Sequence, residues 1–302
     1  MARKKKISAA QELEQREKFK KLVIIAMFSD DELMERLVLK GGNAIDLIHC
    51  ASTRASADVD LSIDGDFPSE VRRALLGKIE KSLKDTFRPE GFQVFDVKLN
   101  EQPPELTTDL EDFWGGYGVE FKLIELDRYE DLKGNVETLR KSAVQLGQGP
   151  KFSIDISKHE YTSGKIQFEL DGFAVFVYTP EMIVCEKLRA ICQQMPEYGP
   201  VVKRNRPGAS RARDFIDIHS LMSARKINLT ARQNRELLSQ VFAAKRVSLS
   251  LLRKVEQYRE FHRTSYAAVV DTVKADVTLK GFDFYVNFVL ELIKQLEPLG
   301  DE

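Results

Sequence analysis

The pattern of hydrophobic and polar positions changes character near residue 179. Before this point, short runs alternate apolar and polar residues and are bounded by turn residues, a pattern typical of β-strands. The predicted strands cover residues 58–63, 92–99, 117–126, 151–157, 166–170 and 173–178. After this point apolar residues recur at helical spacing and no convincing strand remains. We therefore divide the chain into an α/β part, residues 1–178, and a helical part, residues 179–302.

Helical spacing and capping residues locate the helices. Thr179 is a favourable N-cap and Pro180 a favourable first helical residue, so we expect a helix to begin there. The predicted helices cover residues 8–37 with a break at 29–31, 68–87, 129–146, 179–194, 211–223, 229–244, 247–263 and 282–296. We expect a loop over 196–210. The last helix is apolar on more than one face, so it belongs either to the core, which we favour, or to a partner surface.

The composition limits the class of protein. The chain has 302 residues, of which 43% are hydrophobic, so it can bury a substantial core. Its net charge of −1 means that affinity for nucleic acid must come from local basic patches. The 3 cysteines have no metal-ligand spacing. No apolar leader and no run long enough to span a membrane is evident, so we expect a cytoplasmic protein without a membrane partner.

The stretch 40-KGGNAIDLIHCASTRASADVDLSI-63 carries the strongest chemical signal. Strand alternation places Asp58 and Asp60 on one face, opposite the apolar Val59 and Leu61. Two like charges this close need a cation or full solvation. Glycines at a helix start expose backbone N–H groups that favour phosphate. Because Mg²⁺ is usually held by carboxylates together with substrate phosphates, the two features together predict metal-dependent phosphoryl transfer, with Mn²⁺ as the alternative ion.

These motifs resemble those of the DNA polymerase beta-like nucleotidyltransferase superfamily, and more closely its AbiEii/AbiGii (abortive-infection, type IV toxin) branch. The branch motif reads Lys-Gly-Gly-Thr-Ala-Leu and then Arg-x-Ser-x-Asp-hydrophobic-Asp-Leu. The matching residues here are Lys40, Gly41, Gly42, Asn43, Arg54, Ser56, Asp58 and Asp60. Asn43 replaces the usual Thr, and the gap between the two halves is slightly long. Two later family motifs match 186-EKLRA-190 and 211-RARDFIDI-218, so the resemblance extends over residues 37–222.

The resemblance implies a fold and a set of roles. The fold is α+β, a nucleotidyltransferase core with a mixed sheet and flanking helices, followed by a helical C-terminal domain. Asp58 and Asp60 would bind the metal, and Lys187 would contact the triphosphate. Asp214 or Asp217 would orient the triphosphate or the acceptor. The implied nucleotide-binding residues are Lys40, Gly41, Gly42, Asn43, Arg54, Ser56 and Arg211.

The superfamily also implies a third carboxylate on a later strand. Asp155 interrupts the apolar alternation of 151-KFSIDIS-157 and is favoured over Glu120 as general base or further metal ligand. The alternative for Lys187, Asp214 and Asp217 is an exposed ion pair, with Arg213 four residues before Asp217.

A basic segment adjoins the second motif of the helical part. Its cations are Lys203, Arg204, Arg206, Arg211 and Arg213. Such a run is often a solvated loop, but next to the predicted site it is also suited to contact an RNA backbone.

The resulting hypothesis is a metal-dependent nucleotidyltransferase toxin that moves a nucleoside monophosphate from an NTP to an acceptor hydroxyl and releases pyrophosphate. The resemblance implies an abortive-infection or toxin–antitoxin system, RNA (tRNA) as acceptor and a cognate antitoxin as partner. A protein side chain is the alternative acceptor. A second hypothesis is a non-catalytic module that binds or senses an NTP. A third, a nuclease, leaves the Gly-Gly pair unexplained.

Overall fold

A computed structural model describes residues 9–50, 58–145, 149–273 and 277–298. Its centre is one sheet with the strand order β3-β4-β5-β2-β1-β7-β6. The strands are β1 (Val38–Leu39), β2 (Val59–Ser62), β3 (Phe92–Gln102), β4 (Gly116–Glu125), β5 (Phe152–Ser157), β6 (Ile166–Leu170) and β7 (Phe173–Val177). The pairs β1–β7 and β2–β5 are parallel and the others antiparallel, so the sheet is mixed. This mixed sheet with flanking helices confirms the predicted fold class.

One face of the sheet is apolar and is covered by helices α1 (Ala9–Phe28) and α4 (Ser69–Phe87), which pack against each other. The ring of Phe19 in α1 lies 5.9 Å from that of Phe152 in β5, and Phe87 of α4 lies 6.1 Å from Phe121 in β4. Because strand side chains alternate, Ile154 of β5 shares this covered face and is fully buried. The opposite face of the same strands is therefore left for polar side chains.

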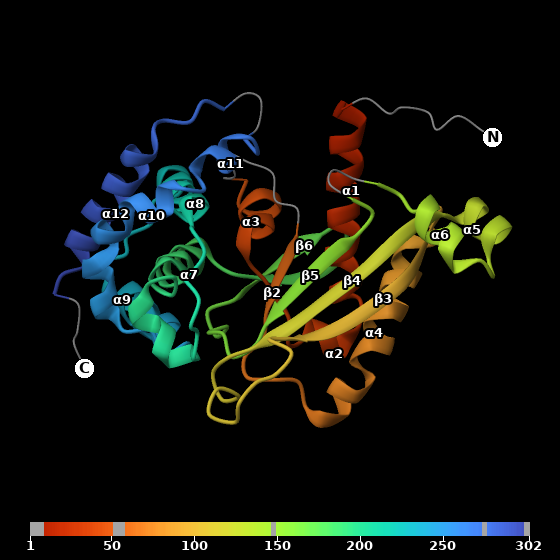
Figure 1. Cartoon of the computed structure of the whole chain (residues 1–302), viewed down its shortest axis with the longest axis horizontal. Helices are drawn as coiled ribbons and strands as arrows, with labels where there is room; N and C mark the ends of the chain where they lie inside the picture. The colour runs from red at the N-terminus through yellow and green to blue at the C-terminus, as the bar shows by residue number, and fades with distance from the viewer. Residues whose placement is uncertain (1–8, 51–57, 146–148, 274–276, 299–302) are drawn as a thin grey trace.

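The described residues after β7 are helical or irregular, and Figure 1 shows these helices gathered at one end of the molecule. They are α7 (Pro180–Cys192), α8 (Ala212–Ala224), α9 (Arg232–Ala243), α10 (Arg259–Arg263), α11 (Tyr266–Val270) and α12 (Phe282–Leu296), with 3-10 helices at Pro196–Val202 and Leu249–Tyr258. Thr179 caps α7 as predicted, by accepting a hydrogen bond from the backbone N–H of Met182. The boundary at residues 178 and 179 stays a prediction, although every described strand precedes it.

Several predicted elements differ in detail. The helix predicted over 129–146 is two short helices, α5 (Leu126–Leu132) and α6 (Val136–Ser142), because Gly134 between them takes a left-handed φ of 98°. The helix predicted over 247–263 is a 3-10 helix followed by α10, and part of the loop predicted over 196–210 is also a 3-10 helix. The break predicted at 29–31 separates α1 from α2 (Asp31–Met34), and the two-residue strand β1 escaped prediction.

The C-terminal helix α12 buries most of one side, including Val286 and Val289, as its apolar pattern predicted. Among the described residues, no helix is both long enough and apolar enough to cross a membrane.

Candidate active site

A cleft of about 570 Å³ lies where the polar face of the sheet meets the helices that follow it. From the sheet side it is lined by Lys40, Gly41, Gly42, Asp60, Gln102, Pro103, Trp114, Gly115, Gly116, Tyr117, Asp155, Ile156, Ser157 and Glu160. From the helical side it is lined by Glu186, Lys187, Arg189, Gln193, Arg206, Arg211, Arg213, Asp214 and Lys245. The cleft thus brings together the motifs that lie far apart in the sequence.

Asp60 and Asp155 form the carboxylate pair of the sheet side. They are register partners on the parallel strands β2 and β5, so their side chains leave the same face of the sheet next to each other. Burial raises the pKa of Asp60 to about 6; Glu186 and Asp155 add to the rise and Lys40 opposes it. Burial and Asp58 also raise the pKa of Asp155. The pair is therefore a desolvated site that favours a proton or a metal cation.

Neighbouring residues leave room around this pair. Gly118 of β4 is the register partner of Asp155, and a Cβ there would lie 2.1 Å from the Gln102 amide nitrogen. Without that Cβ, the Gln102 amide reaches Asp155 and donates a hydrogen bond of 3.4 Å to its carboxylate. The competing acid, Glu120, lies one pleat further along β4 and pairs with Lys151 at 2.7 Å. Glu120 is not among the residues that line the cleft.

Gly41 is required by both its conformation and its surroundings. Its φ is 66°, and an added Cβ would lie 2.3 Å from the Asp60 carboxylate oxygen Oδ2. Residues Gly41–Asn43 form the short helix α3, which continues as a π-helical turn over Ala44–Ile48. The Gly-Gly pair therefore lets the start of this helix approach the carboxylate pair closely.

The other residues of the opening motif take different positions. Asn43 is fully buried, and its amide nitrogen lies 2.5 Å from the backbone oxygen of Asp58, to which it donates a hydrogen bond. Its predicted contact with phosphate stays a prediction. Asp58 is exposed and is not among the residues that line the cleft. Arg54 and Ser56 lie outside the described residues.

Two of the three predicted metal ligands, Asp60 and Asp155, thus lie together on the cleft. Within residues 9–50, 58–145, 149–273 and 277–298, no group of three or more His, Cys, Asp or Glu side chains could hold a metal ion by itself. Mg²⁺ needs only one or two carboxylates when substrate phosphates and water complete its shell. The desolvated pair beside the close approach of Gly41 fits that requirement.

Lys187 of α7 and two aspartates of α8 form a second charged cluster. The Lys187 ammonium lies 2.9 Å from Asp214 and 2.8 Å from Asp217. All three side chains are buried, with at most 5% of each exposed. The alternative of an exposed ion pair at the surface is therefore wrong. Asp217 pairs with Lys187, so a simple pair between Arg213 and Asp217 does not explain the motif. The three-residue spacing of the aspartates puts both on the helix face that meets α7.

Arg211 extends this cluster toward the cleft. Its guanidinium Nε lies 3.1 Å from Asp214, and its backbone N–H donates a hydrogen bond of 3.1 Å to the His262 ring nitrogen Nδ1. Burial lowers the pKa of His262 to about 4, so the ring is neutral at pH 7 and accepts this bond.

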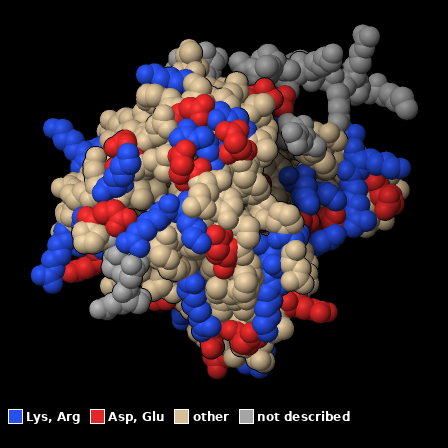
Figure 2. Space-filling view, turned by 60° about the vertical axis from the view of Figure 1, so that its left-hand side comes forward, with Lys and Arg blue, Asp and Glu red and all other residues tan. Residues whose placement is uncertain are grey.

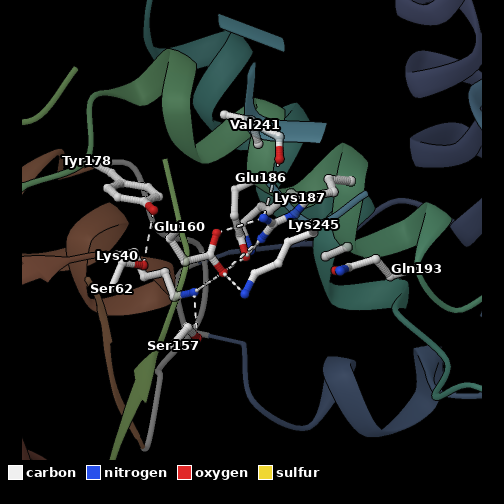
Figure 3. Close-up of polar contacts among 12 residues, drawn as sticks. Lys40, Ser62, Ser157, Glu160, Tyr178, Glu186, Lys187, Gln193, Val241 and Lys245 are labelled. Atoms are coloured by element: carbon white, nitrogen blue, oxygen red, sulfur yellow. Dashed lines mark hydrogen bonds and ion pairs between the residues drawn. The ribbon is translucent and has the colours of Figure 1, made fainter. Parts of the chain in front are cut away.

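A third charged network was missed by the sequence interpretation. At its centre the buried Glu160 accepts hydrogen bonds from the Arg189 guanidinium at 2.7 and 3.1 Å and from the Lys40 ammonium at 3.4 Å. The Lys245 ammonium lies 3.9 Å from the same carboxylate, and Glu186 lies 3.4 Å from Arg189. Figure 3 shows Lys40 and Lys245 reaching Glu160 from opposite sides. Although burial opposes ionisation, these cations hold the pKa of Glu160 well below its usual range.

One signal for this network was present in the sequence. Glu186 and Arg189 are members of the EKLRA motif, as Lys187 is, and α7 is otherwise a buried apolar helix. Charged residues in such a helix need partners. Glu160 and Lys245 gave no signal, because they come from separate loops.

The basic segment separates into two groups. Lys203 pairs with Asp109 at 2.6 Å, and Arg204 donates to the backbone oxygen of Met195 at 3.2 Å. Arg206 and Arg213 instead line the cleft, are exposed, and make no hydrogen bond or ion pair with any other residue that the structure describes. Besides Arg211, only the second group offers charge to a ligand.

The comparisons with known proteins identify a family. Residues 23–287 match the family described as nucleotidyl transferase AbiEii toxin, type IV TA system. No curated protein matches the sequence.

The comparison with solved structures gives matches that include the following three. A candidate nucleotidyltransferase from H. pylori has 17% identity and a TM-score of 0.50, with 98% of this chain and 100% of that chain covered. JHP933 from Helicobacter pylori has 17% identity and a TM-score of 0.49, with 96% and 95% covered. An antigenic nucleotidyltransferase-like protein from Paracoccidioides brasiliensis has 16% identity and a TM-score of 0.35, with 84% and 92% covered.

Proposed function

This chain belongs to the AbiEii family of nucleotidyltransferase toxins of type IV toxin–antitoxin systems, and we propose that it transfers a nucleoside monophosphate from an NTP to a hydroxyl of RNA. Membership implies a nucleotide substrate and an antitoxin partner. The observation that supports the reaction most strongly is the Asp60–Asp155 register pair, desolvated and facing a cleft whose other wall carries cations. Such a site stabilises the charge that develops during phosphoryl transfer.

The chain's own residues divide the work. Lys40 and the backbone of Gly41 would contact the NTP phosphates, as would Lys187 and Arg211 from the helical side. Asp214 and Asp217 would hold the Lys187 ammonium in position. Asp155, whose pKa is raised, is suited to take the proton from the attacking hydroxyl.

A magnesium ion would be held by Asp60 and Asp155, with Asp58 close by in sequence. When bound, it would neutralise phosphate charge and favour ionisation of the attacking hydroxyl.

RNA is the favoured acceptor because of Arg206 and Arg213. Both guanidinium groups are exposed at the cleft and have no partner among the described residues. Free guanidinium groups beside a reaction site suit the phosphates of a polyanion. Elsewhere, basic and acidic side chains are interspersed over the face shown in Figure 2, so a polyanion would be attracted locally.

The proposal is tested by transfer of label from each of the four α-³²P NTPs to total cellular RNA in the presence of Mg²⁺. We expect labelled RNA with the wild type and none with the Asp58→Ala, Asp60→Ala variant. Label on protein would show that the acceptor is a protein and not RNA, while the nucleotidyl transfer itself would stand. Binding of an NTP without any transfer would favour a sensing module and overturn the proposal.

A further inference from the structure

Glu160 lies outside the family motifs that led to the site, yet it contacts Lys40, the first residue of one of them. We propose that Glu160 is a positioning residue, which fixes the ammonium of Lys40 at the floor of the cleft so that it meets the phosphates of a bound NTP. This inference rests on the proposed function, because it assumes that an NTP occupies the cleft.

The contacts of Lys40 carry the proposal. Its ammonium donates hydrogen bonds to the Ser157 hydroxyl at 3.0 Å and to Glu160 at 3.4 Å. The Glu186 carboxylate also lies 3.8 Å from this ammonium, beyond hydrogen-bond distance. An ammonium has three donors, so the two hydrogen bonds leave one N–H for a ligand in the cleft that Lys40 lines. A lysine side chain is long and flexible, and without such anchors it would adopt many rotamers. The two bonds therefore select one position for the charge.

Glu160 is itself held rigidly. The Arg189 guanidinium donates hydrogen bonds to both carboxylate oxygens of Glu160. The guanidinium also donates to Glu186 at 3.4 Å and to the Val241 backbone oxygen at 3.5 Å. Glu160 and Arg189 are buried, and bidentate pairs of this kind define geometry closely. Because Arg189 offsets its charge, Glu160 can orient Lys40 without fully neutralising it.

Lys245 contacts the same carboxylate but has another role. Its ammonium donates to the backbone oxygens of Phe113 at 3.2 Å and Lys158 at 2.5 Å, and lies 3.9 Å from Glu160. These carbonyl contacts tie Lys245 to the loop that follows β5 and the loop that precedes β4. Lys40 is therefore the cation of this network that adjoins the Gly-Gly motif, whereas Lys245 connects two loops.

A double-mutant cycle tests the proposal. The full chain is compared as wild type, Glu160→Gln, Lys40→Met and the double variant, and the dissociation constant is measured for the α-³²P NTP that binds the wild type most tightly, without RNA. We expect each single variant to bind about tenfold more weakly, the loss expected for one charged hydrogen bond. The double variant should bind no more than about twofold more weakly than Lys40→Met alone.

A purely structural role for Glu160 would give a different result. General damage to the fold would multiply with the loss from Lys40→Met, and multiplied losses would overturn the proposal. An unchanged dissociation constant in Glu160→Gln would also overturn it. Glu120→Gln with Lys151→Met is the matched control, an acid and a lysine paired at 2.7 Å outside the cleft, and should leave NTP binding unchanged.

Ser157→Ala provides a second cycle if Glu160→Gln does not fold. It removes only the hydroxyl that accepts from Lys40, and we expect binding about threefold weaker in the wild-type background and unchanged in Lys40→Met. Equal losses in both backgrounds would count against anchoring of Lys40.

The outcomes also separate this inference from the proposed function. Coupled losses of NTP binding in a protein that labels no RNA would support the positioning role and reject the transferase. Labelled RNA together with multiplied binding losses would support the transferase and reject the positioning role. A wild type that binds none of the four NTPs would overturn both.

Discussion

The two carboxylate pairs of the cleft differ in how their charge is satisfied. Asp214 and Asp217 share the Lys187 ammonium at 2.9 and 2.8 Å, so the helical pair carries its own cation. Asp60 and Asp155 share no ammonium or guanidinium at ion-pair distance among the described residues, and burial raises the pKa of both. The pair on the sheet is therefore prepared for a cation from outside, whereas the pair on the helix is part of the structure.

This difference separates residues that serve the reaction alone from residues that also hold the site together. Removal of an acid from the sheet pair should lower activity and leave the fold intact. Removal of the cation from the helical pair should damage the fold first, because two buried like charges lose the ammonium that they share.

The largest expected effect tests the sheet pair. Asp155→Asn should lower transfer to RNA by about a thousandfold or more, since it removes a proposed base and metal ligand worth about 4 kcal/mol of transition-state stabilisation. Rates of label transfer from the preferred NTP measure this. Glu120→Gln, on the same sheet face but outside the cleft, is the control and should retain full activity. Equal losses of transfer rate in both variants would show that Asp155 has no special role in the reaction.

The next effect tests the helical pair. Lys187→Met should lower the free energy of unfolding by about 3–5 kcal/mol, the usual cost of removing one partner from a buried ion-pair cluster. Urea unfolding measures it. The triple variant with Asp214→Asn and Asp217→Asn should recover much of that loss. A Lys187→Met protein as stable as the wild type would show that the cluster does not stabilise the fold.

A third effect concerns pH. The folded pKa of Asp60, about 6, exceeds its ordinary value of 3.8, so the folded state binds more protons between these values. Without metal, stability should therefore fall as pH rises from about 4 to 6, by up to about 3 kcal/mol from this group. Unfolding of wild type and Asp60→Asn across this range measures the difference. Mg²⁺ should restore stability above pH 6 only in the wild type, and parallel curves for both proteins would reject this account.

The smallest effect concerns the rim of the cleft. Arg206→Gln and Arg213→Gln should each weaken RNA binding several-fold and reduce the slope of log K against log salt by about one. Salt titrations of RNA affinity measure this. Lys203→Gln is the control, because Lys203 already pairs with Asp109. A full slope in the double arginine variant would place the acceptor elsewhere.

The sequence predicted those parts of the molecule that local spacing determines. The faces of β2 and β5 follow from alternation, and the covered face of the sheet is apolar as expected. Thr179 and Pro180 mark the start of α7 through local capping. Asp60, Asp155 and Lys187, predicted from motifs, all line one cleft.

The parts that escaped prediction depend on contacts between distant residues. Glu160 contacts Arg189 and Lys245 only after the sheet and helices pack, and no spacing in the sequence predicts these contacts. The two-residue strand β1 exists because it is hydrogen-bonded between β2 and β7. Asn43 occupies a motif position, but its contact with Asp58 is set by the close packing of the turn.

The close approach of Gly41 to Asp60 has a consequence for genetics. Any side chain at residue 41 would collide with the Asp60 carboxylate, 2.3 Å from where its Cβ would stand. Cells that escape a toxic gene by mutation therefore have a route that spares every acidic residue. We expect Gly41→Ala and Gly41→Val alleles among such survivors, and a survey that scored alleles by their acids alone would count them as active.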